Sequence, residues 1–340
     1  MQEEDGTKME AGDRGNGKVF VISLHRTMTR STDALLSMAG LETVHWPKSF
    51  QGRDLQEAVR GREEDLEEVY EILSPVLSYY DAFGDVPFPT LFRQMARDYP
   101  EARFVLVHRE PWAWARSVRS MIRGRELKPF EKVQYWPYLS KPVKNLRTVT
   151  DEDLLGVYFS HLFAVNDFFE SRGELDRLCF VSIDDPEAGE KITRFLGLQP
   201  RAFPRIVGGQ TDWQTLQEWL GAAPHKPDPH RVLTQVLEQR GSLNEAVEAA
   251  RDLVRRDPSD PNPYRLLTRL LEKAGRRREA LSAAEKAVEA GTRSPNLHGK
   301  AAMRALSHGR AFRAVGLLLK MGLLKGERFK DKRGGLLPFV

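Results

Sequence analysis

The stretch KVFVISLHRTMTRST, residues 18–32, joins an apolar run to a loop that is rich in hydroxyl and guanidinium side chains. The apolar part predicts a buried strand over 18–23, and a helix is expected to begin near Ser31. The polar side chains of the loop are Arg26, Thr27, Thr29, Arg30, Ser31 and Thr32. A helix N-terminus offers free N–H groups and the positive end of the helix dipole, so this loop predicts a pocket for an anion. The alternative is an ordinary turn between strand and helix, with Ser31 or Thr32 as the helix cap.

A second segment of the same kind lies further along the chain. Residues 103–108 predict another strand, Arg109 follows it, and Pro111 is placed to open a helix that carries Ser117. Two such segments predict an enzyme that handles a nucleotide with two separated phosphates. The pattern G-x-x-x-x-G-K-[ST] is missing from the first loop, which disfavours a Mg²⁺-dependent nucleotide hydrolase or kinase.

Short β-rich runs alternate with amphipathic segments before residue 219. Further strands are expected at 43–46, 81–86 and 178–183. Helices are expected to begin near Glu63, Pro89, Pro111 and Pro186, and residues 151–172 predict one long helix. This alternation predicts an α/β fold, a P-loop-like parallel sheet sandwiched by helices. In such sheets the ligand binds beyond the carboxyl ends of the strands, where both phosphate segments lie.

The C-terminal part contains an internal repeat of 34 residues. Leu233, Leu237, Gly241, Ala246 and Ala250 recur as Leu267, Leu271, Gly275, Ala280 and Ala284, and then as Ala301, Ala305, Gly309, Ala314 and Leu318. Small residues let two antiparallel helices approach closely, and the glycine separates the helices. The period resembles that of tetratricopeptide repeats and predicts an all-α repeat domain that binds a protein or peptide partner. The alternative is an unrelated helical bundle with a chance periodicity.

The expected domains follow from these changes in pattern. They are a disordered tail (1–17), an α/β domain (18–222), a Pro/His-rich linker (223–231), tetratricopeptide-like repeats (232–322) and a basic tail (323–340). Residues 226–340 carry 24 Lys/Arg and 13 Asp/Glu, a net charge of +11. Because the whole chain has a net charge of +4, residues 1–225 have a net charge of −7. No recognised nucleic-acid motif accompanies the basic half, so a solvated basic surface is expected there rather than a nucleic-acid partner.

Cysteine usage and hydropathy set further bounds. Cys179 is the only cysteine, which excludes a disulfide framework and a cysteine metal site. No apolar run approaches the roughly 20 residues that a membrane-spanning helix needs. Residues 1–17 have no hydrophobic core and are not expected to be a signal peptide. The expected compartment is the cytoplasm, and no metal is expected.

With Ser117 following Arg109 by eight residues, the chain resembles the sulfotransferase family over roughly residues 17–215. Segments 80–87, 99–111 and 195–205 are also similar to the bacterial branch of that family. The resemblance implies transfer of a sulfuryl group from 3′-phosphoadenosine 5′-phosphosulfate (PAPS), as cosubstrate, to a hydroxyl or amine acceptor. It implies that residues 26–32 grip the 5′-phosphosulfate and that Arg109 and Ser117 grip the 3′-phosphate. The loop around Arg205 is expected to close over the 3′-phosphate.

Two features depart from the family's loop pattern. Met28 stands where a glycine would let the backbone approach phosphate. The loop also has no lysine to protonate or stabilise the oxygen that bridges sulfur and the 5′-phosphate in PAPS. Arg26 is the candidate for that charge, although a guanidinium donates a proton less readily.

A base must take the proton of the acceptor at the carboxyl edge of the sheet. Asp85, near the end of a predicted strand, is the first candidate and His45 is the second. The structural alternatives are a helix cap or hydrogen bond for Asp85 and a core histidine for His45. Trp112, Trp114, Trp136 and Tyr138 concentrate near residues 124–150, a segment that is expected to form a lid or acceptor wall; core packing is the alternative for the first two.

Two hypotheses of different classes follow. The leading one is a PAPS-dependent sulfotransferase joined to helical repeats. The competing one is a scaffold whose α/β domain has lost its chemistry and whose repeats recruit partners. Loss of the loop lysine and glycine favours the scaffold, whereas Arg109, Ser117 and Asp85 favour the enzyme.

Overall fold

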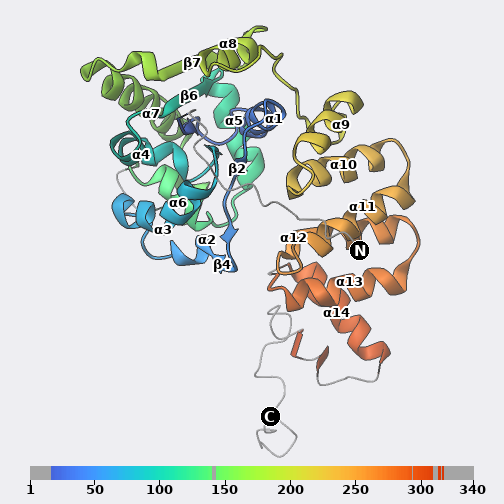
Figure 1. Cartoon of the computed structure of the whole chain (residues 1–340). Coiled ribbons are helices and arrows are strands. Elements are labelled where there is room, and N and C mark those ends of the chain that lie inside the picture. The colour runs from blue at the N-terminus through green and yellow to red at the C-terminus, as the bar shows by residue number, and fades with distance from the viewer. Residues whose placement is uncertain (1–16, 140–142, 293, 309–312, 315, 318–340) are drawn as a thin grey trace, which may run out of the picture. The chain divides into compact units, whose positions relative to one another are not determined.

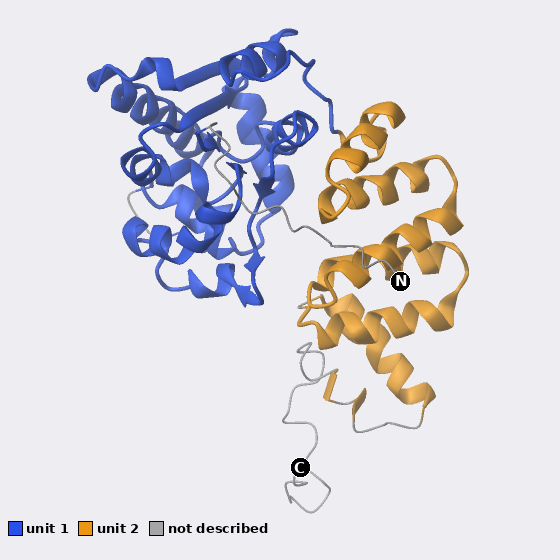
Figure 2. Ribbon diagram, viewed as in Figure 1, with its two compact units in different colours: residues 1–206 blue, residues 207–340 orange. Residues whose placement is uncertain are grey.

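Residues 17–139, 143–292, 294–308, 313–314 and 316–317 are described by the structure, a computed structural model. The chain divides into two compact units, Met1–Ile206 and Val207–Val340 (Figure 2). The first unit is an α/β domain and the second is built from helices.

The first unit contains a five-stranded parallel sheet with the strand order β2-β5-β1-β6-β7 (Figure 1). Its strands are β1 (Val19–Val21), β2 (Thr43–His45), β5 (Ala82–Gly84), β6 (Arg103–His108) and β7 (Leu178–Ser182). All five predicted strands are present, and every pairing between them is parallel. Because β1 and β6 are neighbours, the two phosphate segments leave the sheet side by side at its carboxyl edge.

Apolar side chains cover both faces of the sheet, which is why its strands are apolar without alternation. On one face Phe20 stacks on Phe83, with ring centroids 5.1 Å apart, and lies 5.4 Å from Phe104. The other face, which includes Val21 and Val105, packs against a different set of helices. Burial of one such side chain stabilises the fold by roughly 1.5–3 kcal/mol.

Helices lie on both faces of this sheet, as predicted. Those of the first unit are α1 (Thr29–Met38), α2 (Leu55–Ala58), α3 (Leu66–Tyr79), α4 (Phe92–Asp98), α5 (Pro111–Ile122), α6 (Pro129–Tyr135), α7 (Asp151–Ser171) and α8 (Ala188–Phe195). Short 3₁₀ turns are η1 (Phe88–Leu91), η2 (Leu146–Thr148) and η3 (Leu175–Arg177), and β3 (Ser49–Phe50) pairs with β4 (Arg53–Asp54) in a separate hairpin. Helices α1 and α8 cover one face, and α3, α4 and α7 cover the other.

The second unit repeats a pair of helices. Its elements are η4 (Gly208–Gln210), α9 (Trp213–Ala222), α10 (Pro227–Gln239), α11 (Leu243–Arg256), α12 (Pro261–Lys273), α13 (Arg277–Glu289) and α14 (Pro295–Ser307). Pro227, Pro261 and Pro295 open α10, α12 and α14 at intervals of 34 residues. Gly241 and Gly275, with φ of 79° and 70°, make the left-handed turns between paired helices. The helical repeat is thus confirmed, although part of the third unit lies outside the described residues.

The division of the chain differs from the predicted boundary. We expected the α/β domain to extend to residue 222 and a linker to occupy 223–231. Instead the first unit ends at Ile206, α9 belongs to the second unit, and α10 begins at Pro227 inside the expected linker. Proline fits the first turn of a helix and Asp228 adds a favourable negative charge, so this Pro-rich stretch starts a helix. The expected tails, 1–17 and 323–340, lie outside the described part except for residue 17.

Candidate functional site

The loop between β1 and α1 contains two non-glycine residues with left-handed backbone. Arg26 has a φ of 69° and Met28 a φ of 60°. Thr27 between them is buried, and its Oγ1 donates a hydrogen bond to the Leu24 carbonyl (2.5 Å). Met28 is the N-cap of α1, and no side chain caps that helix in the described structure. The first turn of α1 therefore keeps N–H groups that can donate hydrogen bonds to an anion.

Ser31 and Thr32, the caps of the alternative interpretation, have other partners. Thr32 Oγ1 donates to the Met28 carbonyl (3.3 Å). Ser31 is buried, and its Oγ accepts a hydrogen bond from the Ile206 N–H (3.1 Å). Ser31 thus fixes the chain directly after Arg205, whose own side chain is exposed.

Arg26 joins the two phosphate segments. Its Nε donates to the Ser117 hydroxyl (3.0 Å), and its carbonyl accepts from Arg109 Nη1 (3.2 Å). The pKa of Arg26 is lowered by its partial burial and by the nearby positive charge of Arg30, with a contribution from Arg109, although Asp85 opposes these effects. Like charges held this close favour the arrival of an anion.

Two buried cationic donors in this region have no protein partner. The Nε atoms of Arg30 and Arg109 are buried and form no hydrogen bond with the residues that the structure describes. A buried donor without a partner costs about 1–3 kcal/mol, and more when it is charged. A phosphate or sulfate group would satisfy these donors with charge-assisted hydrogen bonds.

Asp85 and His45, predicted as alternative bases, form one pair. Asp85 Oδ2 lies 3.1 Å from His45 Nε2, and its Oδ1 accepts a hydrogen bond from the Val86 N–H (2.9 Å). His45 Nε2 also lies 3.1 Å from the hydroxyl of Thr29, in the first turn of α1. Burial would raise the pKa of Asp85, but His45 and the Val86 N–H lower it below its usual value. The carboxylate is therefore ionised beside an imidazole that reaches the first turn of α1.

The predicted aromatic residues have different environments. Trp114 is fully buried, whereas Trp112 is 46% exposed. Trp136 is half-buried, and the Tyr138 hydroxyl lies 2.8 Å from His161 Nδ1. The expected lid over 124–150 contains α6, and its residues 140–142 lie outside the described part.

Comparison with protein families gives a match over the first unit. The family model for the sulfotransferase domain matches residues 18–211, more than half of the chain. The chain belongs to the sulfotransferase family. The matched residues of this sulfotransferase include both phosphate segments, the Asp85–His45 pair and Arg205.

Similar solved structures are MamA proteins, with low overall similarity. The crystal structure of MamA is 12% identical, covers 52% of this chain and 93% of that chain, and has a TM-score of 0.30. MamA AMB-1 is 22% identical, covers 33% of this chain and 66% of that chain, and has a TM-score of 0.26. Scores this low carry no inference about function. None of the curated proteins gives a significant match.

The sulfotransferase domain also uses residues that the sequence did not single out. Tyr158 Oη accepts a hydrogen bond from the Arg109 N–H (3.0 Å) and donates one to the Arg109 carbonyl (2.6 Å). His161 Nε2 lies 2.7 Å from the Ile22 carbonyl, and burial lowers the pKa of His161 to about 4. Both residues come from α7 and hold the carboxyl ends of strands next to the site. Tyr158 and His161 belong to no motif in the sequence of α7, so the sequence does not predict that they hold these strand ends.

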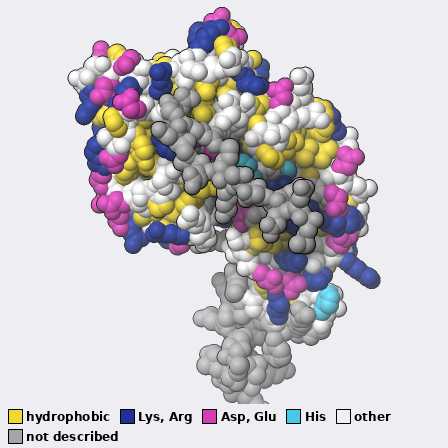
Figure 3. All heavy atoms as spheres, viewed as in Figure 1, with side chains coloured by type: hydrophobic (Ala, Val, Ile, Leu, Met, Phe, Trp, Pro, Cys, Tyr) yellow, Lys and Arg dark blue, Asp and Glu magenta, His cyan; other side chains and the backbone are white. Residues whose placement is uncertain are grey.

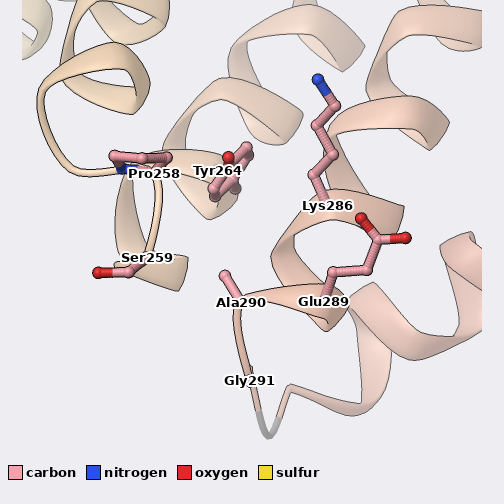
Figure 4. A pocket seen from close by; sticks show the side chains of 7 residues that line it. All are labelled: Pro258, Ser259, Tyr264, Lys286, Glu289, Ala290 and Gly291. Carbon is pink, nitrogen blue, oxygen red and sulfur yellow. The ribbon is translucent and has the colours of Figure 1, made fainter.

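The repeats contain a pocket of their own. Residues of α12, of α13, of the turn before α12 and of the turn after α13 surround an open hollow of about 660 Å³ (Figure 4). A second hollow of about 340 Å³ lies against α11, α12 and α13 and shares Tyr264 and Lys286 with the first. Its floor is apolar, with Leu267 and Leu271 buried.

Charges on the described surface are interleaved. Figure 3 shows basic and acidic side chains side by side on the viewed face. In the repeats Glu238 pairs with Arg269 and Lys273, and Arg251 pairs with Glu279. Among the described residues there is no group of three or more His, Cys, Asp or Glu side chains that could hold a metal ion. Nor does any helix in those parts of the chain have the length and apolar character to cross a membrane.

Proposed function

We propose that the first unit transfers a sulfuryl group from PAPS to a hydroxyl or amine acceptor. The observation that supports this most directly is the convergence of three guanidinium groups at the N-terminus of α1. Within the described part of the chain, two of their buried Nε atoms have no partner and no side chain caps that helix. Arg26 follows β1 and Arg109 follows β6, so one anion is proposed for each of these segments. The family model supports the sulfotransferase class, and PAPS is the donor that this class implies.

Catalysis in such a reaction depends on positioning and charge stabilisation. The acceptor atom forms the new bond to sulfur while the bond between sulfur and the bridging phosphate oxygen breaks. The product 3′-phosphoadenosine 5′-phosphate then carries the negative charge that develops on that oxygen. Arg26, Arg30 and the first N–H groups of α1 are the proposed groups that stabilise this charge. Arg109 and Ser117 are proposed to bind the 3′-phosphate. The loop around Arg205 is proposed to close over that phosphate.

The proton of the acceptor is proposed to pass to the Asp85–His45 pair. The carboxylate is ionised and 3.1 Å from His45 Nε2, so a proton that arrives on either group is shared between them. Thr29 connects this pair to the first turn of α1. The base and the charge-stabilising loop are therefore held in one hydrogen-bonded unit.

The test is a comparison of thermal shifts. At 100 times its Kd, a ligand stabilises the native protein by about 2.7 kcal/mol, which corresponds to a Tm shift of roughly 5–10 °C for a domain of this size. 3′-Phosphoadenosine 5′-phosphate should produce such a shift, and ADP should produce much less. Arg109→Ala should abolish the preference for the 3′-phosphorylated ligand. Arg194→Ala on the surface of α8, where Arg194 pairs with Glu190, is the matched control and should keep it.

The same measurement separates the competing classes. Stabilisation by neither nucleotide supports a scaffold that has lost its chemistry. Stabilisation by ADP alone supports a kinase. Labelled PAPS with a panel of acceptors would then identify the acceptor class.

We further propose that the repeats bind a protein or peptide partner. The hollows around Tyr264 and Lys286 support this, because the second has a floor of buried Leu267 and Leu271 and both have a rim of mixed charge. Figure 4 shows Lys286 and Glu289 on the rim of the first. Arg255 and Lys286 are exposed on the rim of the second. The proposed compartment is the cytoplasm, where the single cysteine Cys179, buried with a raised pKa of about 11, would stay reduced.

A further inference from the structure

His25, the residue before Arg26, is held by three side chains from two helices. Its N–H donates to Gln134 Oε1 (3.0 Å), and its carbonyl accepts from Trp114 Nε1 (2.9 Å). Its ring Nε2 lies 2.7 Å from the hydroxyl of Tyr135. Trp114 belongs to α5, and Gln134 and Tyr135 belong to α6. All four side chains are buried, with exposed fractions of 2% or less.

These contacts fix the backbone on both sides of Arg26. The His25 carbonyl belongs to the peptide plane that precedes the Arg26 Cα, and Trp114 holds that plane. The Arg26 carbonyl belongs to the plane that follows, and Arg109 Nη1 donates to it. Peptide units are planar, so the orientations of these two planes define φ and ψ at Arg26. The left-handed φ of 69° is thus imposed by side chains from outside the loop.

The loop needs such support because it has no glycine. A non-glycine residue with left-handed backbone is strained and persists only where the surroundings over-determine its conformation. Both Arg26 and Met28 are in that conformation. The pKa of His25 is lowered by burial and that of Tyr135 is raised by burial, so both groups are neutral and their hydrogen bond does not depend on pH near neutrality.

We infer that His25, Gln134 and Trp114 are positioning residues that hold the phosphate loop in its binding conformation. The inference rests on the proposed function, because the loop is taken to bind the 5′-phosphosulfate. Helix α6 lies within the segment expected to be a lid, and here it acts as a fixed support for the loop. None of the three residues needs to touch the nucleotide.

Two substitutions in the full-length protein test this role. Gln134→Met removes the acceptor for the His25 N–H and preserves side-chain length, and Trp114→Phe removes the indole N–H and preserves most of the ring. Trp219→Phe is the matched control, because Trp219 is also fully buried and its Nε1 has no partner among the described residues. The probes are 3′-phosphoadenosine 5′-phosphate, which reports on both phosphate sites, and 3′-AMP, which reports on the 3′-site alone.

Isothermal titration calorimetry should show about tenfold weaker binding of 3′-phosphoadenosine 5′-phosphate by Gln134→Met and Trp114→Phe. Binding of 3′-AMP by Gln134→Met should stay within twofold of the wild type, since among the described residues no hydrogen bond joins α6 to Arg109 or Ser117. Trp219→Phe should change neither. Equal loss for both probes in Gln134→Met, or no loss for either, overturns the positioning role.

Hydrogen exchange gives a readout without nucleotide. The backbone amides of residues 24–27 should exchange at least tenfold faster in Gln134→Met than in the wild type, while those of Trp219→Phe should not change. Unchanged exchange in Gln134→Met overturns the inference. Absence of nucleotide binding by the wild type would instead contradict the proposed function, and the exchange rates would still decide whether the helices hold the loop.

Discussion

Asp85 shows how burial and pairing compete at a single residue. The side chain of Asp85 is 10% exposed, and that burial alone would favour the neutral acid. The pKa is nevertheless lowered, because His45 lies 3.1 Å away and Val86 donates its N–H. A buried group that stays ionised beside a titratable partner, at the carboxyl edge of a parallel sheet, is a candidate for catalysis.

Asp85→Asn is expected to abolish most of the sulfuryl transfer while preserving the shape of the site. General base catalysis typically contributes about 10²–10⁴-fold, so kcat should fall by about 100-fold or more. KM for PAPS should change little, because the substitution leaves the guanidinium groups in place. Steady-state kinetics with a fixed acceptor measure both constants, and an unchanged kcat would remove Asp85 from the mechanism.

The same variant has a defined pH dependence of stability. A carboxyl whose folded pKa lies below its unfolded value of about 3.9 stabilises the fold at pH values above that value. This contribution is lost as the pH falls through the folded pKa. The difference in the free energy of unfolding between wild type and Asp85→Asn should therefore be constant from pH 7 to about pH 5 and shrink below about pH 4. Urea denaturation across that range measures it.

At the scale of elements, two glycines in helices have opposite surroundings. A Cβ at Gly189 in α8 would lie 2.2 Å from the Phe203 backbone nitrogen and 2.6 Å from the Arg201 carbonyl oxygen. A Cβ at Gly156 in α7 would meet nothing within 4 Å. The first glycine thus allows α8 to pack against the chain that leads to Ile206, whereas the second only weakens its helix.

Gly189→Ala and Gly156→Ala should therefore change stability in opposite directions. Overpacking against backbone costs typically about 1–3 kcal/mol, so Gly189→Ala should be destabilising by that amount. Alanine in place of an exposed helical glycine stabilises by roughly 0.5–1 kcal/mol, which is the expectation for Gly156→Ala. Chemical denaturation gives both values, and equal effects of the two substitutions would contradict the packing described for α8.

The parts of the fold that depend on local pattern were predictable. The five strands and the 34-residue helix pairs follow from apolar runs, prolines at helix starts and glycines at turns. The strand before Arg109 and the helix that carries Ser117 follow from the same signals, whereas the binding of a phosphate by these two residues stays a prediction. Pro227 starts α10, although the sequence predicts a linker there. Proline is common both in linkers and in the first turn of a helix, and packing decides between these outcomes.

The parts of the site that depend on register were not predictable. His45 meets Asp85 because β2 pairs with β5, with His45 opposite Gly84. Gln134 and Tyr158 reach the loop and Arg109 from helices far along the chain, and their neighbours in the sequence carry no motif. Such contacts arise from tertiary packing, which local periodicity does not encode.

At the scale of the whole molecule, the two units have separate hydrophobic cores. Leu73 is buried in the first unit and Leu271 in the second. A ligand that binds only the native first unit should stabilise that unit by mass action and leave the other unaffected.

Calorimetry of the full chain should accordingly show two transitions. Leu271→Ala, which removes about 2–5 kcal/mol of core stability, should lower one of them, and Leu73→Ala should lower the other. 3′-Phosphoadenosine 5′-phosphate should raise only the transition that Leu73→Ala lowers. A single transition that all three changes move together would show that the units unfold cooperatively.

An acidic residue near the end of one helix joins each pair to the next in the second unit. Glu238 on α10 and Glu272 on α12 stand 34 residues apart, and each pairs with the first helix of the next helix pair. Glu238 forms ion pairs with Arg269 and Lys273 on α12, and Glu272 forms one with Lys300 on α14. A module built from like connectors can gain or lose a whole pair of helices and still join its ends in the same way. Tandem duplication therefore offers this protein a route to a longer recognition surface that leaves the chemistry of the first unit untouched.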